Sequence, residues 1–390
     1  ARSRTPGGPA DGQMATGEEA PKDVALPDAE NSQGEAAVSQ ASSAVVGKTS
    51  TSVSRLNRLT GRSPSLLRRR QQWLIFYHES VRRLAEQLKD EMGDNAELSA
   101  LQWRRFPDGF PNLSVERQDV HRLEQFFGTC LIVSFHNPEV IFEQLCLLHE
   151  LPRMRAKNFH VIMPWFCTGT MERVERLGQI ATAKSLADML SCCPVGPGGP
   201  MTLVTYDIHW LQEQFYFSDP LLVELRTAVP LCLELLSRAR AAAPDEEVVV
   251  AFPDEGAHKK MKDTFKDYPF VICDKVRDGA RRIVTIIEGQ DNIAGKHCVI
   301  IDDMVMSGAL MLECAQQLHS MGAARISCFT VHAVMPKQAW KKFIDTGILH
   351  RFWITDTMPS TADEVRGVEP FEVITIAPLV ASYLLGYGET

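Results

Sequence analysis

The chain has 390 residues, of which 45% are hydrophobic and 23% charged, and its formal net charge is −8. This composition is that of an ordinary globular protein with material for one large or two medium-sized domains. The negative charge argues against a general nucleic-acid-binding protein, because neutralising a phosphate backbone requires a basic face. Apolar runs such as 130–135 and 298–301 are too short to span a bilayer, so we expect no membrane span.

Residues 1 to about 70 are rich in Ala, Ser, Gly and Thr and contain few large apolar side chains. Such a segment cannot bury enough surface to offset chain entropy, so we expect a disordered or targeting extension. Residues 36–70 are rich in Ser and Arg and contain no acidic residue, as in transit peptides, whereas the stretch before them is acidic. The localisation therefore stays open between the cytoplasm and an organelle, either a plastid or a mitochondrion.

From Trp73 onward, short apolar runs alternate with segments of helical periodicity. The runs at 73–77, 130–135, 159–163, 203–206, 248–252, 299–301 and 326–331 have the length of buried strands. This alternation predicts βαβ units and parallel sheets flanked by helices. A helix expected near 221–241 separates two such series, so we predict one α/β domain at 71–220 and another at 221–390.

A candidate phosphate-binding turn follows the strand expected at 296–301. It reads Asp302-Asp303-Met304-Val305-Met306-Ser307-Gly308. The helix expected after it has one apolar face, formed by Met311, Cys314, Ala315 and Leu318. At a strand end, adjacent carboxylates can hold a ribose diol and Mg²⁺, and a hydroxyl with bare backbone before a helix attracts phosphate. An Asp pair that merely caps the helix is the alternative interpretation.

Four other segments place polar residues at turns or strand ends. They are Phe106-Pro107-Asp108-Gly109, Tyr206-Asp207-Ile208-His209, Phe252-Pro253-Asp254-Glu255-Gly256 and Asp274-Lys275-Val276-Arg277. Each has an ordinary explanation when taken alone. The first can be a plain Asp-Gly hairpin turn, a single histidine at a strand end is most often structural, and cations on a loop usually face solvent.

In chain order, from about 73 to 384, these segments resemble the motifs of the ribose-phosphate pyrophosphokinases, also called phosphoribosyl pyrophosphate synthetases. His136-Asn137-Pro138, Gly199-Pro200 and the loop at 168–173 are similar to the plant-type class II members. The resemblance implies two type I phosphoribosyltransferase-like lobes, each a mainly parallel sheet flanked by helices, with the phosphoribose loop in the C-terminal lobe. It also implies a homo-oligomer, or a subunit of a larger assembly, in which one subunit completes the ATP site of another.

For ATP, the resemblance implies four binding residues. Phe106 would stack on the adenine and Asp108 would accept its amino group. Arg173 would contact the triphosphate, and its alternative is a solvated arginine at a helix start. His209 would be a ligand of Mg-ATP, and Mg²⁺, held by His209 and Asp254, is the expected cofactor.

For ribose 5-phosphate, the resemblance implies that Asp254, Asp302 and Asp303 orient the sugar. Ser307 and Gly308 would hold the 5-phosphate. After this serine the family usually continues Gly-Gly-Thr or Gly-x-Thr, whereas this chain continues Gly308-Ala309-Leu310. The hydroxyl of that threonine is absent here, so we expect weaker phosphate binding, because a hydrogen bond to a charged group contributes roughly 1.5–3 kcal/mol.

The implied reaction transfers pyrophosphate from Mg-ATP to the anomeric hydroxyl of ribose 5-phosphate and releases AMP. Lys275 and Arg277 would be the catalytic residues, closing over the group in transfer. Two alternatives stay open. Leu310, Met306 and the altered ATP loop favour a catalytically impaired, structural or regulatory subunit. A type I phosphoribosyltransferase would use the same Asp-Asp loop but would not need the segments around Phe106 and His209.

Overall fold

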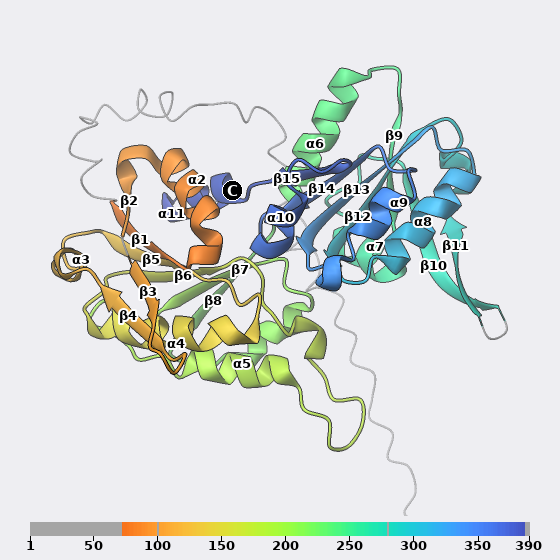
Figure 1. The fold of residues 1–390 in the computed structure, drawn as a ribbon. Helices are drawn as coiled ribbons and strands as arrows, with labels where there is room; N and C mark the ends of the chain where they lie inside the picture. Colours follow the sequence, from red (N-terminus) through yellow and green to blue (C-terminus); the bar gives the residue numbers. More distant parts are fainter. Residues whose placement is uncertain (1–71, 100, 279–280, 387–390) are drawn as a thin grey trace, which may run out of the picture. The chain divides into compact units, whose positions relative to one another are not determined.

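The computed structural model describes residues 72–386 except 100 and 279–280, and it describes no side chains for 275–283. The extension expected at 1–70 therefore lies outside the described residues. The described chain contains two large sheets accompanied by helices, drawn in Figure 1. None of the helices in this part of the chain is long and apolar enough to cross a membrane.

The first sheet has six parallel strands in the order β2-β1-β5-β6-β7-β8. These strands are β1 (Trp73–Tyr77), β2 (Ala96–Leu98), β5 (Gly128–Ile132), β6 (Phe159–Met163), β7 (Thr202–Tyr206) and β8 (Leu222–Arg226). Its helices are α2 (Arg82–Met92), α3 (Arg117–Arg122), α4 (Pro138–Arg153) and α5 (Thr182–Ser191), with 3₁₀ helices at Gly169–Met171 and Leu211–Tyr216. Strands β3 (Leu101–Arg105) and β4 (Pro111–Val115) form a separate antiparallel hairpin.

The second sheet has seven strands in the order β11-β10-β9-β12-β13-β14-β15, and only the β10–β11 pair is antiparallel. The strands are β9 (Val248–Phe252), β10 (Phe270–Asp278), β11 (Arg281–Glu288), β12 (His297–Val305), β13 (Arg325–Ala333), β14 (Arg351–Thr355) and β15 (Phe371–Ile374). The helices are α6 (Val229–Ala242), α7 (Glu255–Met261), α8 (Ala309–Ser320), α9 (Lys341–Asp345), α10 (Pro359–Val365) and α11 (Ala377–Leu384). The predicted fold class, mainly parallel sheets flanked by helices, is confirmed.

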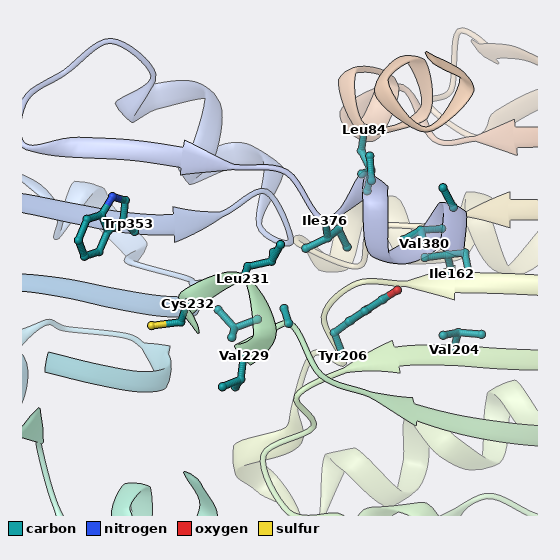
Figure 2. Close-up of a cluster of buried hydrophobic side chains, with 14 of the residues drawn as sticks. Leu84, Ile162, Val204, Tyr206, Val229, Leu231, Cys232, Trp353, Ile376 and Val380 are labelled. Atoms are coloured by element: carbon teal, nitrogen blue, oxygen red, sulfur yellow. The ribbon is translucent and has the colours of Figure 1, made fainter. Parts of the chain in front are cut away.

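The apolar composition of the strands explains why helices cover the sheets. Every residue of β7 and of β9 is buried, as expected for central strands of parallel sheets. Helix α8 buries the four residues that its periodicity predicts, Met311, Cys314, Ala315 and Leu318. One core cluster contains side chains from both sheets and from α2, α6 and α11, so the two sheets share a hydrophobic core (Figure 2).

The prediction of a helix near 221–241 is wrong for the first residues of that range. Residues Leu222–Arg226 form β8, which pairs with β7 at the edge of the first sheet, and α6 begins only at Val229. Pro230 lies in the first turn of α6, where a missing N–H costs nothing, so the proline marks the helix start. The first sheet thus extends to Arg226. The division into domains at 71–220 and 221–390 stays a prediction.

Strand β12 is longer than the sequence suggests. It runs to Val305, and Asp302 pairs with Thr330 of β13, so both aspartates belong to the strand and not to the turn. The strand order of the second sheet reverses between β9 and β12. After β9 the chain adds β10 and β11 on one side of this pair, and after β12 it adds β13 to β15 on the other side. In open α/β sheets, such a switch point is where ligands bind, beyond the carboxyl ends of the strands. Asp254 follows β9 and Asp302 lies near the end of β12, so both flank this point.

The C-terminal helix α11 is tied down by a buried carboxylate. The N–H of Ile376 donates to Oδ1 of Asp356 at 2.9 Å, while Oδ2 has no hydrogen-bond partner. Burial raises the pKa of Asp356 to about 6, and the hydrogen bonds from the Thr375 side chain and the Ile376 N–H oppose this rise. The carboxyl therefore holds its proton more tightly in the folded chain than in the unfolded one.

We expect the substitution Asp356→Asn to remove a pH-dependent loss of stability. Because the folded pKa lies above the ordinary 3.8, this carboxyl favours the folded state most at low pH, and that contribution is lost as the pH rises through about 6. Between pH 5 and 8 the free energy of unfolding of the wild type should fall by about 1.5 kcal/mol more than that of the variant. Urea unfolding at several pH values measures this, and parallel pH profiles would contradict it.

Candidate active site

The carboxylate of Asp303 is the centre of an ion cluster drawn from three elements. Its Oδ2 accepts a hydrogen bond from Nζ of Lys260 at 2.7 Å and lies 3.3 Å from Nδ1 of His209. Asp303 belongs to β12, Lys260 to α7, and His209 follows β7 of the first sheet. Lys260 also donates to the carbonyl of Ile208 at 3.0 Å. Three segments that are 43 or more residues apart in the sequence thus meet at one buried carboxylate.

The two neighbouring aspartates are driven to opposite protonation states. Burial would raise the pKa of Asp303, but the hydrogen bond from His209 and the charge of Lys260 outweigh it and hold that pKa below its ordinary value. The same hydrogen bond raises the pKa of His209. Burial, the charge of Asp303 and the charge of Asp254 all raise the pKa of Asp302. The pair can therefore present one ionised carboxylate beside one that readily takes up a proton.

The segment that carries His209 is fixed by further contacts. Asp207 has a positive φ of 40°, and its carboxylate accepts hydrogen bonds from Thr227 Oγ1 at 2.7 Å and from the N–H of Ala228 at 2.6 Å. Nε2 of His332, from β13, donates to the carbonyl of Tyr206 at 3.0 Å. Burial lowers the pKa of His332 to about 4, so this imidazole is neutral at pH 7. These bonds attach the segment to both sheets.

A small cavity of about 110 Å³ lies beside the ion cluster. Its lining comes from the loop after β6, the segment after β7 and the ends of β12 and β13, and includes Thr168, Gly169, His209, Asp303, Met306 and His332. A ligand pocket for a drug-sized molecule usually measures about 300–1,000 Å³. The cavity is therefore too small to enclose a nucleotide, and only part of one can enter it.

The loop after β6 rests on a buried glutamate. Oε1 of Glu213 accepts a hydrogen bond from the N–H of Trp210 at 3.1 Å, and burial raises the pKa of Glu213 to about 7. A Cβ at Gly169 would lie 3.4 Å from Oε2 of the same carboxyl, so the loop approaches Glu213 closely. Arg173, expected to contact the triphosphate, is at the exposed end of this loop. Its Nε lies 3.2 Å from Glu172, and its guanidinium lies 5.8 Å from the centre of the Trp210 ring.

The expected phosphoribose loop begins at the ion cluster, and its residues Asp303, Met304 and Met306 line the small cavity. Asp254 is the N-cap of α7, and its Oδ1 accepts from the N–H of Ala257 at 2.8 Å. Ser307 is exposed, and its Oγ lies 3.4 Å from the N–H of Ala309, the first residue of α8. Gly308 has a φ of 75°, which favours glycine. Leu310, in the first turn of α8, is partly buried against the apolar core, and its side chain offers a ligand no hydroxyl.

The remaining expected residues are not brought to this cluster by the described chain. Phe106 and Asp108 lie at the tip of the β3–β4 hairpin, where Oδ1 of Asp108 accepts from the N–H of Phe110 at 3.1 Å. The side chain of Phe106 is 50% exposed. Lys275 and Arg277 are in β10, but their side chains lie outside the described residues.

Sequence reasoning missed Lys260 and Glu213 as parts of this site. Lys260 follows Asp254 by six residues on a short helix, where a lysine is normally a solvated charge. Glu213 stands four residues after His209, so both could have been suspected from their closeness to the motifs. Within the described residues, no group of three or more His, Cys, Asp or Glu side chains is arranged to hold a metal ion.

Comparisons with known proteins identify the family of this chain. Residues 73–193 match the N-terminal domain of ribose phosphate pyrophosphokinase, and residues 226–362 match the phosphoribosyl transferase domain. The chain is 41% identical over 317 residues to ribose-phosphate pyrophosphokinase 3, chloroplastic, from Oryza sativa, covering 80% of this chain and 75% of that protein. It is 39% identical over 318 residues to ribose-phosphate pyrophosphokinase 3, mitochondrial, from Spinacia oleracea, covering 80% and 76%. The protein belongs to the ribose-phosphate pyrophosphokinase family.

A solved structure agrees with the fold. Phosphoribosylpyrophosphate synthetase from Mycobacterium smegmatis superimposes with a TM-score of 0.68 at 22% identity, covering 81% of this chain and 98% of that one. At this identity the likeness concerns the fold alone. The two-lobed α/β arrangement is therefore shared with a synthetase whose sequence is distant.

We expect Lys260→Met to destabilise the protein by about 2 kcal/mol, because among the described residues it leaves the buried Asp303 with His209 as its only ion-pair partner. Lys259→Met is the matched control, since Lys259 forms its ion pair with the exposed Glu255 and does not contact Asp303 in the described part of the chain. The control should lose less than about 0.5 kcal/mol. Urea unfolding at pH 7.5 measures both, and an equal loss in the two variants would show that the ion cluster contributes nothing.

Proposed function

We propose that the protein is an active ribose-phosphate pyrophosphokinase. The anomeric hydroxyl of ribose 5-phosphate loses its proton to solvent as its oxygen attacks the β-phosphorus of ATP. The bond between the α,β-bridging oxygen and that phosphorus breaks, and AMP leaves as phosphoribosyl pyrophosphate forms. The observation that carries the proposal is the meeting of His209, Lys260 and Asp303 beside Asp302. Such a cluster supplies opposite charges at fixed positions, and phosphoryl-transfer chemistry depends mainly on positioning and charge neutralisation.

The sugar fits the end of β12. Asp302 and Asp303 are held by the ladder with β13, so their carboxylates are presented from a rigid strand to the ribose hydroxyls. Asp254, at the end of the neighbouring strand, orients the sugar from the other side of the switch point. Ser307 and Gly308 hold the 5-phosphate at the start of α8, where backbone N–H groups and the helix dipole attract anions.

The donor set at this site fits Mg²⁺. Nδ1 of His209 faces Asp303, so in the neutral tautomer Nδ1–H donates to the carboxylate and Nε2 stays available as a ligand. Asp254 uses Oδ1 for its helix cap, which leaves Oδ2 for a cation. Mg²⁺ typically takes one or two protein ligands and completes its shell with phosphate and water, and it would neutralise the charge of the triphosphate.

The protein also has to neutralise the transferring group. We assign this role to Lys275 and Arg277, in the edge hairpin formed by β10 and β11. The assignment rests on the family resemblance of their segment, since their side chains lie outside the described residues. Arg173 contacts the triphosphate from the loop after β6.

An impaired regulatory or structural subunit is the second candidate. Leu310 packs against the core and brings no hydroxyl to the loop, and the exposed side chain of Met306 adds no polar group. The distinction requires an assay of the purified protein, because an impaired subunit would show no turnover alone. A phosphoribosyltransferase would instead release pyrophosphate from phosphoribosyl pyrophosphate and a nucleobase.

We expect AMP to form from ATP only when ribose 5-phosphate and Mg²⁺ are both present. Lys275→Ala should lower kcat on the order of 10²-fold, as when one stabilising donor of a transition state is removed. Arg238→Ala is the control, because Arg238 is an exposed residue of α6 that forms an ion pair with the exposed Glu234 on the same helix. Full turnover in Lys275→Ala would refute the role of that lysine, and an inactive wild type would refute the proposed function.

We also propose that the ATP site is shared between subunits of a homo-oligomer. The cavity beside His209 is too small for a nucleotide, and the exposed rings of Phe106 and Phe110 lie at the hairpin tip, outside its lining. A second subunit's hairpin could cover the adenine, for which an aromatic ring is a suitable stacking surface. We propose an organellar localisation because curated relatives are named as chloroplastic and mitochondrial forms.

Phe106→Ala should raise the KM for ATP about tenfold and leave the KM for ribose 5-phosphate unchanged, because a stacked ring is worth roughly 1–3 kcal/mol. Phe106→Tyr should behave like the wild type, since a tyrosine ring also stacks. Steady-state kinetics with each substrate varied in turn measures both constants. An unchanged KM for ATP in the alanine variant would contradict the adenine contact.

A further inference from the structure

Helix α9 is packed directly against the phosphoribose loop. The ring of Phe343 is 1% exposed, and a Cβ placed on Gly308 would lie only 2.6 Å from it. Phe343 is held in turn by an edge-to-face contact with Phe352 of β14, with ring centres 4.9 Å apart. The loop and the start of α9 are therefore fixed relative to one another by a close apolar contact.

Lys342, the residue before Phe343, places its ammonium group beside the phosphoribose loop. Nζ of Lys342 donates a hydrogen bond to the carbonyl of Ser307 at 3.2 Å. Lys342 is exposed, and in the described part of the chain it takes part in no ion pair. Ser307 and Ala309 beside it are also exposed. The ammonium group thus lies next to the backbone where a 5-phosphate would bind, and no carboxylate of the described residues forms an ion pair with it.

We infer that Lys342 binds the 5-phosphate of ribose 5-phosphate, an inference that rests on the proposed function. A lysine carries a compact charge on a flexible stem, so Nζ can exchange the Ser307 carbonyl for phosphate oxygens by rotating its side chain. The charge-assisted bond that it makes is stronger than a bond from a neutral hydroxyl. Lys342 therefore compensates for Leu310, which faces the core and offers the phosphate no donor.

The neighbouring Lys341 provides a matched control. It is also exposed and lies one residue away on the same helix, but its Nζ is placed 5.5 Å from the centre of the Trp340 ring. Removing either charge changes the net charge of the protein equally. Only the removal of Lys342 takes a cation away from the loop.

The experiment measures binding and turnover for the wild type, Lys342→Met, Lys342→Arg and Lys341→Met. Titration calorimetry with ribose 5-phosphate, and with ribose as the ligand lacking phosphate, gives the affinities. Lys342→Met should weaken ribose 5-phosphate binding and raise its KM about tenfold, with kcat and the KM for ATP within a factor of two. Lys342→Arg should keep the affinity within about threefold, and Lys341→Met should equal the wild type.

Each outcome decides the inference. Equal affinity of Lys342→Met and the wild type overturns it, and so does an equal loss in Lys341→Met, which would indicate a general charge effect. A wild type that does not bind ribose 5-phosphate more tightly than ribose also overturns it. A wild type that forms no AMP, yet binds ribose 5-phosphate in a manner that depends on Lys342, would refute the proposed function and leave the inference standing. Because Lys342 is exposed, all four proteins should have the same thermal unfolding midpoint.

Discussion

The site depends on one buried negative charge. Asp303 lies in the interior of the fold, where an unpaired carboxylate would be costly, and Lys260 and His209 are the groups that keep it ionised. The partners come from a helix of the second sheet and from the end of a strand of the first. The ion pairs of Asp303 therefore hold the segment of His209, from the first sheet, against β12 and α7 of the second sheet. The small cavity lies beside these ion pairs.

Around that charge, rigid and adaptable parts are clearly divided. The two aspartates belong to β12, which is hydrogen-bonded to β13, and the ring of Phe343 packs closely against the turn at Gly308. By contrast, three of the four residues expected to contact ATP lie away from the cluster: Phe106 and Asp108 are on a hairpin tip, and Arg173 is on the exposed end of a loop. A rigid site proposed for the sugar, beside exposed residues proposed to contact the nucleotide, fits the proposed reaction, in which the acceptor must be placed accurately relative to a donor that arrives from solvent.

Local sequence patterns predicted most of the fold and located the segments of the site. The burial of Met311, Cys314, Ala315 and Leu318 follows from helical spacing alone, and the aspartates and His209 were found at strand ends. Strand β8 was missed because its apolar residues were read into the period of the following helix. Lys260 was missed because its partner Asp303 is 43 residues away, and no local pattern reports a contact of that range.

The last helix of the chain completes the core of the first sheet. Val380, Ala381 and Leu384 of α11 belong to the same cluster as Leu84 and Leu88 of α2, and the hydroxyl of Tyr383 lies 2.9 Å from Nδ1 of His160 on β6. A fragment that stopped before α6 would leave the apolar face of α2 uncovered and open to water. The first sheet therefore depends on a helix that follows the second sheet in the chain, and truncation before α11 should destabilise α2 and the first sheet.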